Sequence, residues 1–265
     1  MELNILCQQT IQLAKKAGAF IKQERENFDS SKIEYKGSHT NMVSYVDKEA
    51  EKILVAGLKK VLPEAGYITE EGTETIKGEK YNWIIDPLDG TTNFLHNIPC
   101  YSVSVALACE GKVILGVIYD IVQKECFYAW KDGGAYLNGE KIQVSNVDNL
   151  NHSIIATGFP YQLFDKFDNY MLIIKRFIEQ THGLRRFGSA AIDMAYVASG
   201  RFDGYYEFSI NAWDIAAGII LIQEAGGIVT DFKGGDDFLF SGEIAVGSKV
   251  QAKMLEVINQ EWYKA

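Results

Sequence analysis

The sequence predicts a mixed α/β protein of the α+β kind, and three observations predict this class. Apolar residues recur at helical spacing near the N-terminus, β-rich segments separated by turn residues begin at Tyr81, and strand and helix patterns alternate after about Val147. The chain has 265 residues, 47% of them hydrophobic, which is enough to bury a substantial core.

The first half of the chain combines helices with a run of strands. Apolar periodicity predicts helices over 4–25 and 45–62, and Pro63 stops the second. Residues 66–69 read as a short strand that leads into Glu70-Glu71. An antiparallel meander is expected next, with strands at 101–108, 113–119 and 125–129 and turns at 110–112, 133–134 and 138–139.

The second half alternates strands and helices. Ser189 suits the N-cap of a helix that ends before Gly200. No Pro-rich or Ser-rich tether separates the halves, so 1–147 and 148–265 are expected to form one compact unit. Strands are predicted at 153–157, 183–187, 204–208, 228–231 and 243–246, and helices at 166–179, 189–199, 214–225 and 249–262.

Charge and targeting signals narrow the class of protein. The net charge is −9, which argues against a general nucleic-acid or membrane surface. No segment approaches the roughly 18 consecutive apolar residues of a membrane span. The N-terminus lacks a signal-peptide pattern, and the four cysteines are too scattered for a metal motif or a disulfide scaffold. A cytoplasmic protein with reduced thiols is therefore expected.

The strongest candidate for a functional site is Trp83-Ile84-Ile85-Asp86-Pro87-Leu88-Asp89-Gly90-Thr91-Thr92-Asn93-Phe94. An apolar run shaped like a buried strand ends in two aspartates, which would repel each other without a cation. The Gly-Thr-Thr turn that follows leaves backbone N–H groups free to meet an anion. Carboxylates beside exposed N–H groups are what a divalent metal and a phosphate require, so the segment predicts a metal-dependent phosphatase site.

Two other acidic positions lie where one element gives way to the next. They are Glu70-Glu71 and Asp214, and the carbonyl of Leu88 is a further possible oxygen ligand. Two magnesium ions about 3.5–4 Å apart can activate a water and neutralise a phosphate. Simpler interpretations also exist: Asp214 fits an ordinary helix N-cap, and a pair of glutamates usually faces solvent.

Taken together, these motifs closely resemble those of the inositol monophosphatase family over nearly the whole chain. The first motif is the segment 83–94 quoted above. The intervening acidic element is Thr69-Glu70-Glu71-Gly72. The second motif is Trp213-Asp214-Ile215-Ala216-Ala217-Gly218, followed by Glu224-Ala225-Gly226-Gly227. The order and separation of these motifs make the resemblance highly specific.

The resemblance implies a layered αβαβα sandwich of the inositol monophosphatase and fructose-1,6-bisphosphatase type. It also implies Mg²⁺-dependent hydrolysis of a phosphate monoester, with two or three ions per site, Mn²⁺ as a substitute and sensitivity to lithium. The metal ligands carried over are Glu70, Asp86, the Leu88 carbonyl, Asp89 and Asp214. The catalytic residues are Thr91, Asp47 and Glu70, with Thr91 orienting the attacking water, and the phosphate cradle is Gly90, Thr91 and Thr92.

Several of these positions have an equally plain structural interpretation. Ser44-x-x-Asp47 resembles a capping box at the start of the second helix. Lys36 matches a lysine near the site in relatives, yet a lone loop lysine is usually a solvated charge. Arg185 and Arg186 suit either a second phosphate or carboxylate of a substrate, or a structural ion pair.

Substrate specificity depends on residues beyond the metal ligands. Glu207 matches a glutamate that accepts a hydrogen bond from a sugar-alcohol hydroxyl, and Ala190 matches a contact to the polyol ring. Asp89 and Asp214 are expected to touch substrate as well. In the alternative interpretation, Glu207 is an exposed glutamate of an edge strand and Ala190 only packs within its helix, so neither contacts the substrate.

The resulting hypothesis is a phosphatase that hydrolyses inositol monophosphate by direct attack of a metal-activated water. The first alternative keeps this chemistry but acts on the 2′-phosphate of NADP(H), fructose 1,6-bisphosphate or adenosine 3′,5′-bisphosphate. The second alternative is a binding or regulatory protein that has kept the fold without the chemistry. The expected partners are a small phosphate ester and a second copy of the chain in a homodimer.

Overall fold

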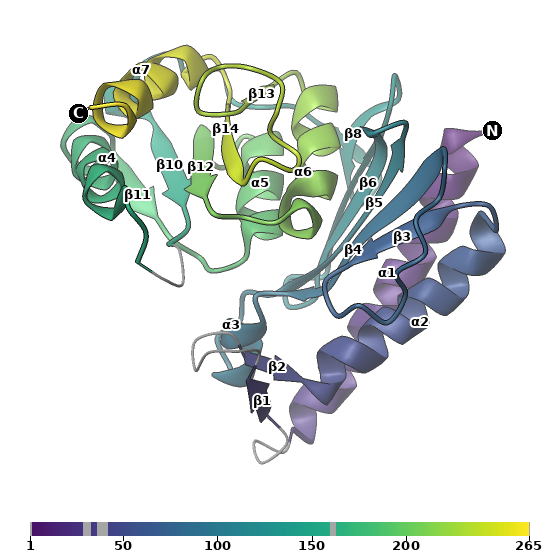
Figure 1. Cartoon of the computed structure of the whole chain (residues 1–265). Coiled ribbons are helices and arrows are strands. Elements are labelled where there is room, and N and C mark those ends of the chain that lie inside the picture. The colour runs from purple at the N-terminus through teal and green to yellow at the C-terminus, as the bar shows by residue number, and fades with distance from the viewer. Residues whose placement is uncertain (1, 29–32, 36–41, 160–162, 265) are drawn as a thin grey trace.

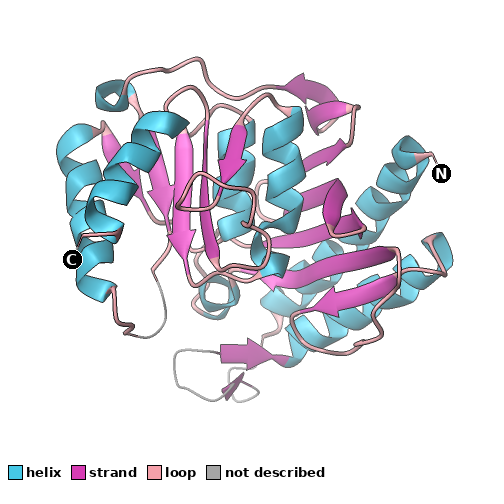
Figure 2. Ribbon diagram, turned by 45° about the horizontal axis from the view of Figure 1, so that its top comes forward, coloured by secondary structure: helices cyan, strands magenta, loops and turns pink. Residues whose placement is uncertain are grey.

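The computed structural model describes residues 2–28, 33–35, 42–159 and 163–264. Its helices and strands form five layers in the order α, β, α, β, α (Figures 1 and 2). The sandwich that the resemblance implies is therefore confirmed. Lys36 lies outside the described residues, so the expectation about this lysine stays a prediction.

The first helical layer consists of α1 (Leu3–Glu26) and α2 (Tyr45–Val61). Both lie along one face of the larger sheet, as Figure 1 shows. The periodicity of the sequence predicted both helices to within two residues at each end. Their apolar stripes pack on sheet residues such as Trp83 and Val105 to form one of the hydrophobic cores.

The larger sheet has seven strands in the order β3-β4-β5-β6-β7-β8-β9. From β4 onwards each neighbouring pair is antiparallel, which confirms the predicted meander. The exception is β3, which pairs with β4 in parallel. The bounds are β3 Gly66–Thr69, β4 Tyr81–Asp89, β5 Ser102–Cys109, β6 Lys112–Asp120, β7 Glu125–Trp130, β8 Gly134–Leu137 and β9 Glu140–Ile142.

Several short elements were not predicted from the sequence. Strands β8 and β9 continue the sheet where only turns were expected, and β1 (Ile33–Tyr35) pairs with β2 (Met42–Ser44) as a separate small sheet. The short helix α3 (Thr91–Leu95) follows β4 directly. Each of these elements has three to five residues, which is too short for hydrophobic periodicity to be recognised.

The second sheet has five strands in the order β11-β10-β12-β14-β13. Strand β10 pairs in parallel with β11 and β12, whereas β14 is antiparallel to β12 and β13. All five strands were predicted, although β11 ends at Arg185 rather than Phe187. The bounds are β10 Ile154–Thr157, β11 Gly183–Arg185, β12 Gly204–Phe208, β13 Ile228–Thr230 and β14 Glu243–Gly247.

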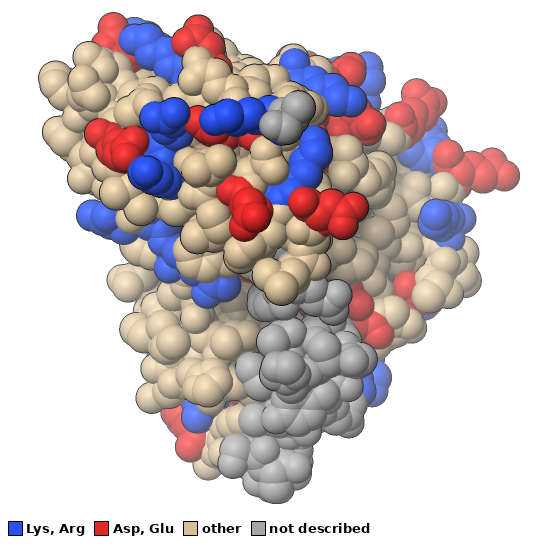
Figure 3. Space-filling model, turned by 60° about the vertical axis from the view of Figure 1, so that its left-hand side comes forward, with Lys and Arg blue, Asp and Glu red and all other residues tan. Residues whose placement is uncertain are grey.

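The outer helical layer on this side consists of α4 (Phe167–Gln180) and α7 (Gln251–Trp262). A short 3-10 turn at Leu150–His152 precedes the second sheet. Acidic and basic side chains are interspersed over the face turned forward in Figure 3. On this layer the half-exposed Arg176 of α4 contacts the buried Glu261 of α7 at 2.8 Å, which joins the two helices.

The central layer consists of α5 (Ala190–Ala198) and α6 (Ala212–Glu224), which lie between the two sheets. Both helices are apolar nearly all round, which is typical of a helix that is buried on every side. A Cβ on Gly116 of β6 would lie 2.7 Å from the carbonyl oxygen of Ala217 in α6. This glycine therefore allows α6 to approach the larger sheet closely.

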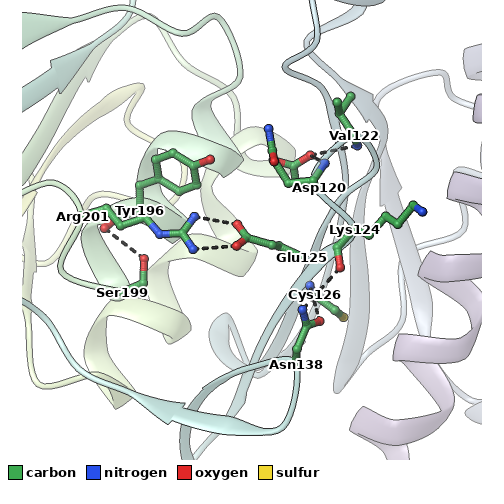
Figure 4. A network of polar contacts seen from close by, with 10 residues as sticks. Asp120, Val122, Lys124, Glu125, Cys126, Asn138, Tyr196, Ser199 and Arg201 are labelled. Carbon is green, nitrogen blue, oxygen red and sulfur yellow. Dashed lines mark hydrogen bonds and ion pairs between the residues drawn. The ribbon is translucent and has the colours of Figure 1, made fainter.

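A two-pronged ion pair also links the halves of the molecule (Figure 4). Arg201, just beyond α5, donates from both terminal nitrogens to the two carboxylate oxygens of Glu125 at the start of β7, each at 2.6 Å. The Arg201 guanidinium also lies 4.7 Å from the ring centre of Tyr196.

The division of the chain into halves near residue 147 stays a prediction, because both sheets share the central helical layer. No helix in the described ranges has the length and apolar character to cross a membrane.

Candidate active site

The parallel pairing of β3 with β4 places Glu70 beside Asp86. Thr69 is in register with Ile85, so the next residue of each chain segment lies at the same edge of the sheet. The backbone N–H of Glu70 donates to the Ile85 carbonyl at 3.2 Å and extends this pairing by one residue. An antiparallel pairing would have placed Glu70 at the opposite end of β4.

An irregularity in β4 brings Asp86 and Asp89 to the same side of the sheet. Residues three apart on a regular strand point to opposite faces. Asp86 is in register with Ser104 and Asp89 with Ser102, so β4 has one residue more than β5 between these pairs. This bulge re-aims the second carboxylate. Both aspartates are buried, with 2% and 8% of their surface exposed.

Asp214 reaches the same place from the second half of the chain. It is the third residue of α6, and its carboxylate accepts from the N–H of Asn211 at 2.9 Å in a capping box. Carboxylate oxygens of Asp86, Asp89 and Asp214 all lie within 4.8 Å of one another. The N-cap of α6 is therefore Asn211, so the interpretation of Asp214 as the N-cap itself is wrong, although Asp214 completes the capping box. The assignment of Asp214 as a metal ligand stays a prediction.

The start of α5 holds Asp89 in place. Oδ2 of Asp89 accepts from the Ser189 hydroxyl at 2.5 Å and from the Ala191 N–H at 2.8 Å. Ser189 also accepts from the N–H of Ile192, so this residue caps the helix as predicted. The first turn of α5 thus supplies donors to a carboxylate on the other sheet.

Thr91 lies between two oxygen groups of the site. Its hydroxyl oxygen is 2.9 Å from Oδ1 of Asp47 and 3.0 Å from the Leu88 carbonyl oxygen. Its single proton can be donated to only one of these acceptors at a time. Gly90, just before it, has φ +92°, and a Cβ there would lie 2.9 Å from the Cys100 carbonyl oxygen. A side chain at Gly90 would therefore disrupt the turn that carries Thr91.

Glu51 fixes the loop that carries Glu70. This buried residue of α2 accepts from the N–H groups of Glu71 and Thr73, both at 2.8 Å, and from the Thr73 hydroxyl at 2.7 Å. It lies one helical turn after Asp47, so α2 presents two carboxylates on one face. Asp47 faces Thr91, and Glu51 organises the neighbouring loop.

The carboxylates of the cluster are difficult to ionise together. Burial, followed by Glu70, Asp89 and Asp214, raises the pKa of Asp86 well above its ordinary value. Burial raises the pKa of Asp89 to about 6, although Ser189 and Ala191 counteract this rise by donating hydrogen bonds. Burial and then Asp89 raise the pKa of Asp214 to about 7. A bound cation would remove the penalty in each case.

These residues fit a hard divalent cation. The donors are carboxylate and carbonyl oxygens, which magnesium and manganese prefer over softer ligands. Among the described residues, no lysine or arginine forms an ion pair with Asp86, Asp89 or Asp214. Arg186, which lines the same cavity, offsets part of the negative charge by lowering the pKa of Asp89, but it forms no ion pair with the three aspartates.

A cavity of about 380 Å³ extends from the acidic cluster towards β12. Its lining contains Ala190 and Glu207, the two residues expected to contact a polyol. Burial raises the pKa of Glu207 to about 8, and the Tyr205 hydroxyl hydrogen bonds to this carboxylate. A Cβ on Gly158 would lie 2.0 Å from the carboxyl carbon of Glu207, so Gly158 leaves the space that this side chain occupies.

The structure places Arg186, and not Arg185, at this cavity. Arg185 ends β11 and is exposed, and it donates to the Leu184 carbonyl at 3.1 Å. The guanidinium of Arg186 lies 5.6 Å from the ring centre of Phe159, another residue of the lining. The expected ion pair is absent for both arginines among the described residues.

Some residues of the site were not identified from the sequence. Glu51 and Asp193 are buried acids, and each lies on the same helical face as a residue that was identified. Glu51 follows Asp47 by four positions, and Asp193 follows Ala190 by three. This spacing is the signal that the sequence offered. The role of Ser189 as a donor to Asp89 left no sequence signal beyond its helix cap.

The fold and this site define the class of protein. Three aspartates meet at the end of β4 beside Glu70, the turn at residues 90–92 adjoins them, and a cavity leads away. Phosphate esters and the metal ions that activate them bind in sites of this kind. A comparison with family models matches the inositol monophosphatase family over residues 3–263. The chain belongs to this family of metal-dependent phosphatases.

Relatives of this chain have two kinds of name. The chain is 44% identical over 248 residues to a "Putative Nus factor SuhB" of Neisseria meningitidis, covering 93% of this chain and 95% of the relative. It is 39% identical over 253 residues to an inositol-1-monophosphatase of Mesorhizobium japonicum, covering 94% of each. The solved structure of the extragenic suppressor protein suhB of Bartonella henselae is 38% identical, with a TM-score of 0.90 and coverage of 96% and 98%.

The raised pKa values predict an unusual dependence of stability on pH. The pKa values of Asp89 and Asp214, about 6 and about 7, exceed those of the unfolded chain, so the folded protein binds more protons between about pH 4 and pH 7. Their contribution to the free energy of unfolding therefore falls as pH rises through this window. Magnesium, which needs deprotonated ligands, should stabilise the protein more at pH 8 than at pH 5.

The measurement is the difference in melting temperature between magnesium and EDTA at each pH. Taking this difference cancels the contribution of carboxylates elsewhere in the chain. We expect a larger difference at pH 8. An equal or smaller difference at pH 8 than at pH 5 would contradict the assignment of Asp89 and Asp214 to a cation site.

Proposed function

We propose that the protein is a Mg²⁺-dependent phosphomonoesterase that hydrolyses inositol monophosphate to inositol and phosphate. The observation that carries this proposal is the convergence of Asp86, Asp89 and Asp214 within 4.8 Å at one end of a cavity whose other end holds Glu207. One end suits a metal and a phosphate, and the other suits a hydroxylated leaving group.

The phosphate end uses the turn after β4. The first N–H groups of a helix have no acceptor within the helix, and those at Gly90, Thr91 and Thr92 border the cavity beside Asp89. The acidic residues and the Leu88 carbonyl would hold magnesium, which when bound would supply positive charge to neutralise phosphoryl oxygens and would make water more acidic. Glu70, next to Asp86, is assigned both to the metal and to the catalytic set.

Thr91 and Asp47 orient the water that attacks phosphorus. When the Thr91 hydroxyl donates to Asp47, 2.9 Å away, its oxygen keeps a lone pair that can accept a hydrogen bond. A water that donates to this lone pair keeps its own oxygen free for the phosphorus atom. No side chain needs to form a bond to phosphorus, and most of the rate enhancement comes from positioning and neutralisation of charge.

The distal end of the cavity favours a polyol as the leaving group. Glu207 is held by the Tyr205 hydroxyl, and its carboxylate borders the cavity together with Ala190. A buried carboxylate that accepts from a substrate hydroxyl discriminates strongly against analogues that lack the hydroxyl. Asp89 and Asp214 border the same space and are assigned contacts to the substrate as well.

The alternative substrates carry a second phosphate or a nucleotide. The 2′-phosphate of NADP(H), fructose 1,6-bisphosphate and adenosine 3′,5′-bisphosphate would use the same metal end. At the distal end a second phosphate would meet the buried acids Glu207 and Asp193, which repel it when they are ionised. Among the described residues that line the cavity, Arg186 is the one basic residue. Its positive charge reduces the repulsion of a second phosphate but does not remove it.

A binding or regulatory role without catalysis is the alternative from another class. The Neisseria meningitidis relative is named a putative Nus factor, which suggests that some members of the family have other partners. Retention of Glu70, Asp86, Asp89, Thr91 and Asp214 argues against loss of the chemistry. We therefore propose catalysis as the primary role. Homodimer formation, lithium inhibition, a cytoplasmic location and substitution by Mn²⁺ stay predictions.

Phosphate release from a panel of substrates tests the reaction and the substrate separately. The panel is inositol 1-phosphate, NADP, fructose 1,6-bisphosphate and adenosine 3′,5′-bisphosphate, each with magnesium, with EDTA and with added lithium. We expect release that requires magnesium and is fastest with inositol 1-phosphate. If inositol 1-phosphate is the poorest of the four, the substrate assignment is wrong. If none is hydrolysed, the catalytic proposal fails for this panel.

Asp89→Asn should lower kcat by at least about 100-fold, because it removes a metal-binding charge at nearly constant volume. The matched control is Asp120→Asn. Asp120 is also buried and accepts from the N–H groups of Val122 and Gln123, but it does not line the cavity. We expect the control to keep kcat within about threefold of the parent. A fully active Asp89→Asn variant at saturating magnesium would refute the metal assignment.

A further inference from the structure

Tyr205 is a buried tyrosine with a single hydrogen bond from its hydroxyl group. Its side chain lies in the apolar cluster around the central helices, together with Ala191 and Val246, and none of it is exposed to solvent. Within the described part of the chain, the hydroxyl donates to one acceptor, Oε2 of Glu207. A phenylalanine would fill almost the same volume, so packing alone does not account for the hydroxyl group.

Strand β12 places Tyr205 and Glu207 on the same face of the second sheet. Residues two apart on a strand point to the same side, and both belong to β12. Tyr206 lies between them and points to the opposite face, where it joins the outer apolar cluster with Tyr170 and Phe177. The contact between the hydroxyl and the carboxylate is therefore made within one strand, at the wall of the cavity.

The second carboxylate oxygen of Glu207 is open to the cavity. Oε1 forms no hydrogen bond with any described residue. It is also not one of the unpaired side-chain oxygens that are closed off from solvent. Glu207 is only partly buried and lines the cavity, so Oε1 is the oxygen that a group bound there can reach.

Gly158 borders the same carboxylate through its backbone. A Cβ at this position would lie 2.0 Å from Oε1 of Glu207, which is much closer than non-bonded atoms approach. Gly158 is itself held in place, because its carbonyl accepts from the Tyr170 hydroxyl at 2.9 Å. The carboxylate thus has a hydrogen-bond donor on one oxygen and, beside the other, a backbone without a side chain to displace it.

We propose that Tyr205 and Gly158 are positioning residues, which hold the Glu207 carboxylate so that Oε1 accepts a hydrogen bond from a hydroxyl of the leaving group. This inference rests on the proposed phosphatase function and deepens it, because it names the residues on which the selectivity of Glu207 depends. A glutamate side chain that was not held would lose rotamer freedom on binding substrate. A carboxylate that is already in position avoids this loss.

The hydrogen bond from Tyr205 also favours the ionised form of Glu207. Burial raises the pKa of this carboxyl to about 8, and the hydrogen bond counteracts part of the rise, as does the positive charge of Arg186. An ionised carboxylate accepts a stronger hydrogen bond than a neutral carboxyl group. Loss of the Tyr205 hydroxyl would therefore weaken recognition of a substrate hydroxyl through both orientation and charge.

The test is a double-mutant cycle in the full-length protein with magnesium. For each variant, kcat/KM is measured with inositol 1-phosphate and with p-nitrophenyl phosphate, whose leaving group carries no further hydroxyl group. We expect Tyr205→Phe to lower the ratio of the two values by at least about fivefold, mainly through a higher KM for inositol 1-phosphate. In a Glu207→Ala background the same substitution should leave the ratio unchanged, because Tyr205 acts through Glu207.

Two further variants separate positioning from packing. Tyr206→Phe is the matched control, since it removes a hydroxyl group from an equally buried neighbour that does not bond to Glu207. It should keep the ratio of the parent. Gly158→Ala should lower the ratio as Tyr205→Phe does, because the added methyl group displaces the carboxylate, which is the far end of a flexible side chain.

An unchanged ratio in Tyr205→Phe, or an equal loss with both esters, would overturn the inference. A full effect of Tyr205→Phe in the Glu207→Ala background would overturn it as well, and an unchanged ratio in Gly158→Ala would remove Gly158 from it. A parent protein that fails to hydrolyse inositol 1-phosphate would instead overturn the proposed function, so the two failures are distinguishable.

Discussion

Repulsion among buried carboxylates is the constraint on which the rest of the structure depends. Asp86 and Asp89 are almost completely removed from water, Asp214 lies within 4.8 Å, and Glu70 adjoins them at the sheet edge. Such an arrangement is unfavourable in the absence of a cation, as the raised pKa values of the three aspartates indicate. The surrounding fold has to hold these groups together against their mutual repulsion.

Three layers of the sandwich contribute to that support. The larger sheet supplies Asp86 and Asp89 through a bulge and Glu70 through a parallel edge strand. The central helices supply Asp214 and the donors that hold Asp89, and α2 supplies Asp47 and Glu51. The Arg201–Glu125 ion pair joins the far end of α5 to the larger sheet, so both ends of this helix are fixed. The acidic cluster is therefore held by contacts from several elements, as catalysis by positioning requires.

The long elements could be predicted from the sequence because their periodicity extends over several turns or a full strand. Helices α1, α2, α4, α6 and α7 were found in this way. The parallel pairing of β3 was not predictable, because strand pairing depends on contacts remote in sequence. The short strands β8 and β9 have too few residues for an alternation of apolar and polar side chains to be recognised in the sequence.

The site was predictable to the extent that its motifs are local. The acidic residues and the Gly-Thr-Thr turn stand out in the sequence, and the structure gathers Asp86, Asp89 and Asp214. The bulge that brings Asp86 and Asp89 together left no sequence signal, and the support of Asp89 by Ser189 crosses one hundred residues. Which of Arg185 and Arg186 reaches the cavity depends on where β11 ends, and a sequence does not fix that point to one residue.

The most direct test of the central claim is to locate the cation. Crystals soaked with manganese, whose anomalous scattering identifies the metal, would show whether a divalent ion sits among these carboxylates. We predict an anomalous peak within coordination distance of Asp86, Asp89 and Asp214, at about 2.0–2.3 Å from their oxygens. A crystal in which manganese binds only elsewhere, with these three aspartates still close together, would contradict the claim that they form a metal site.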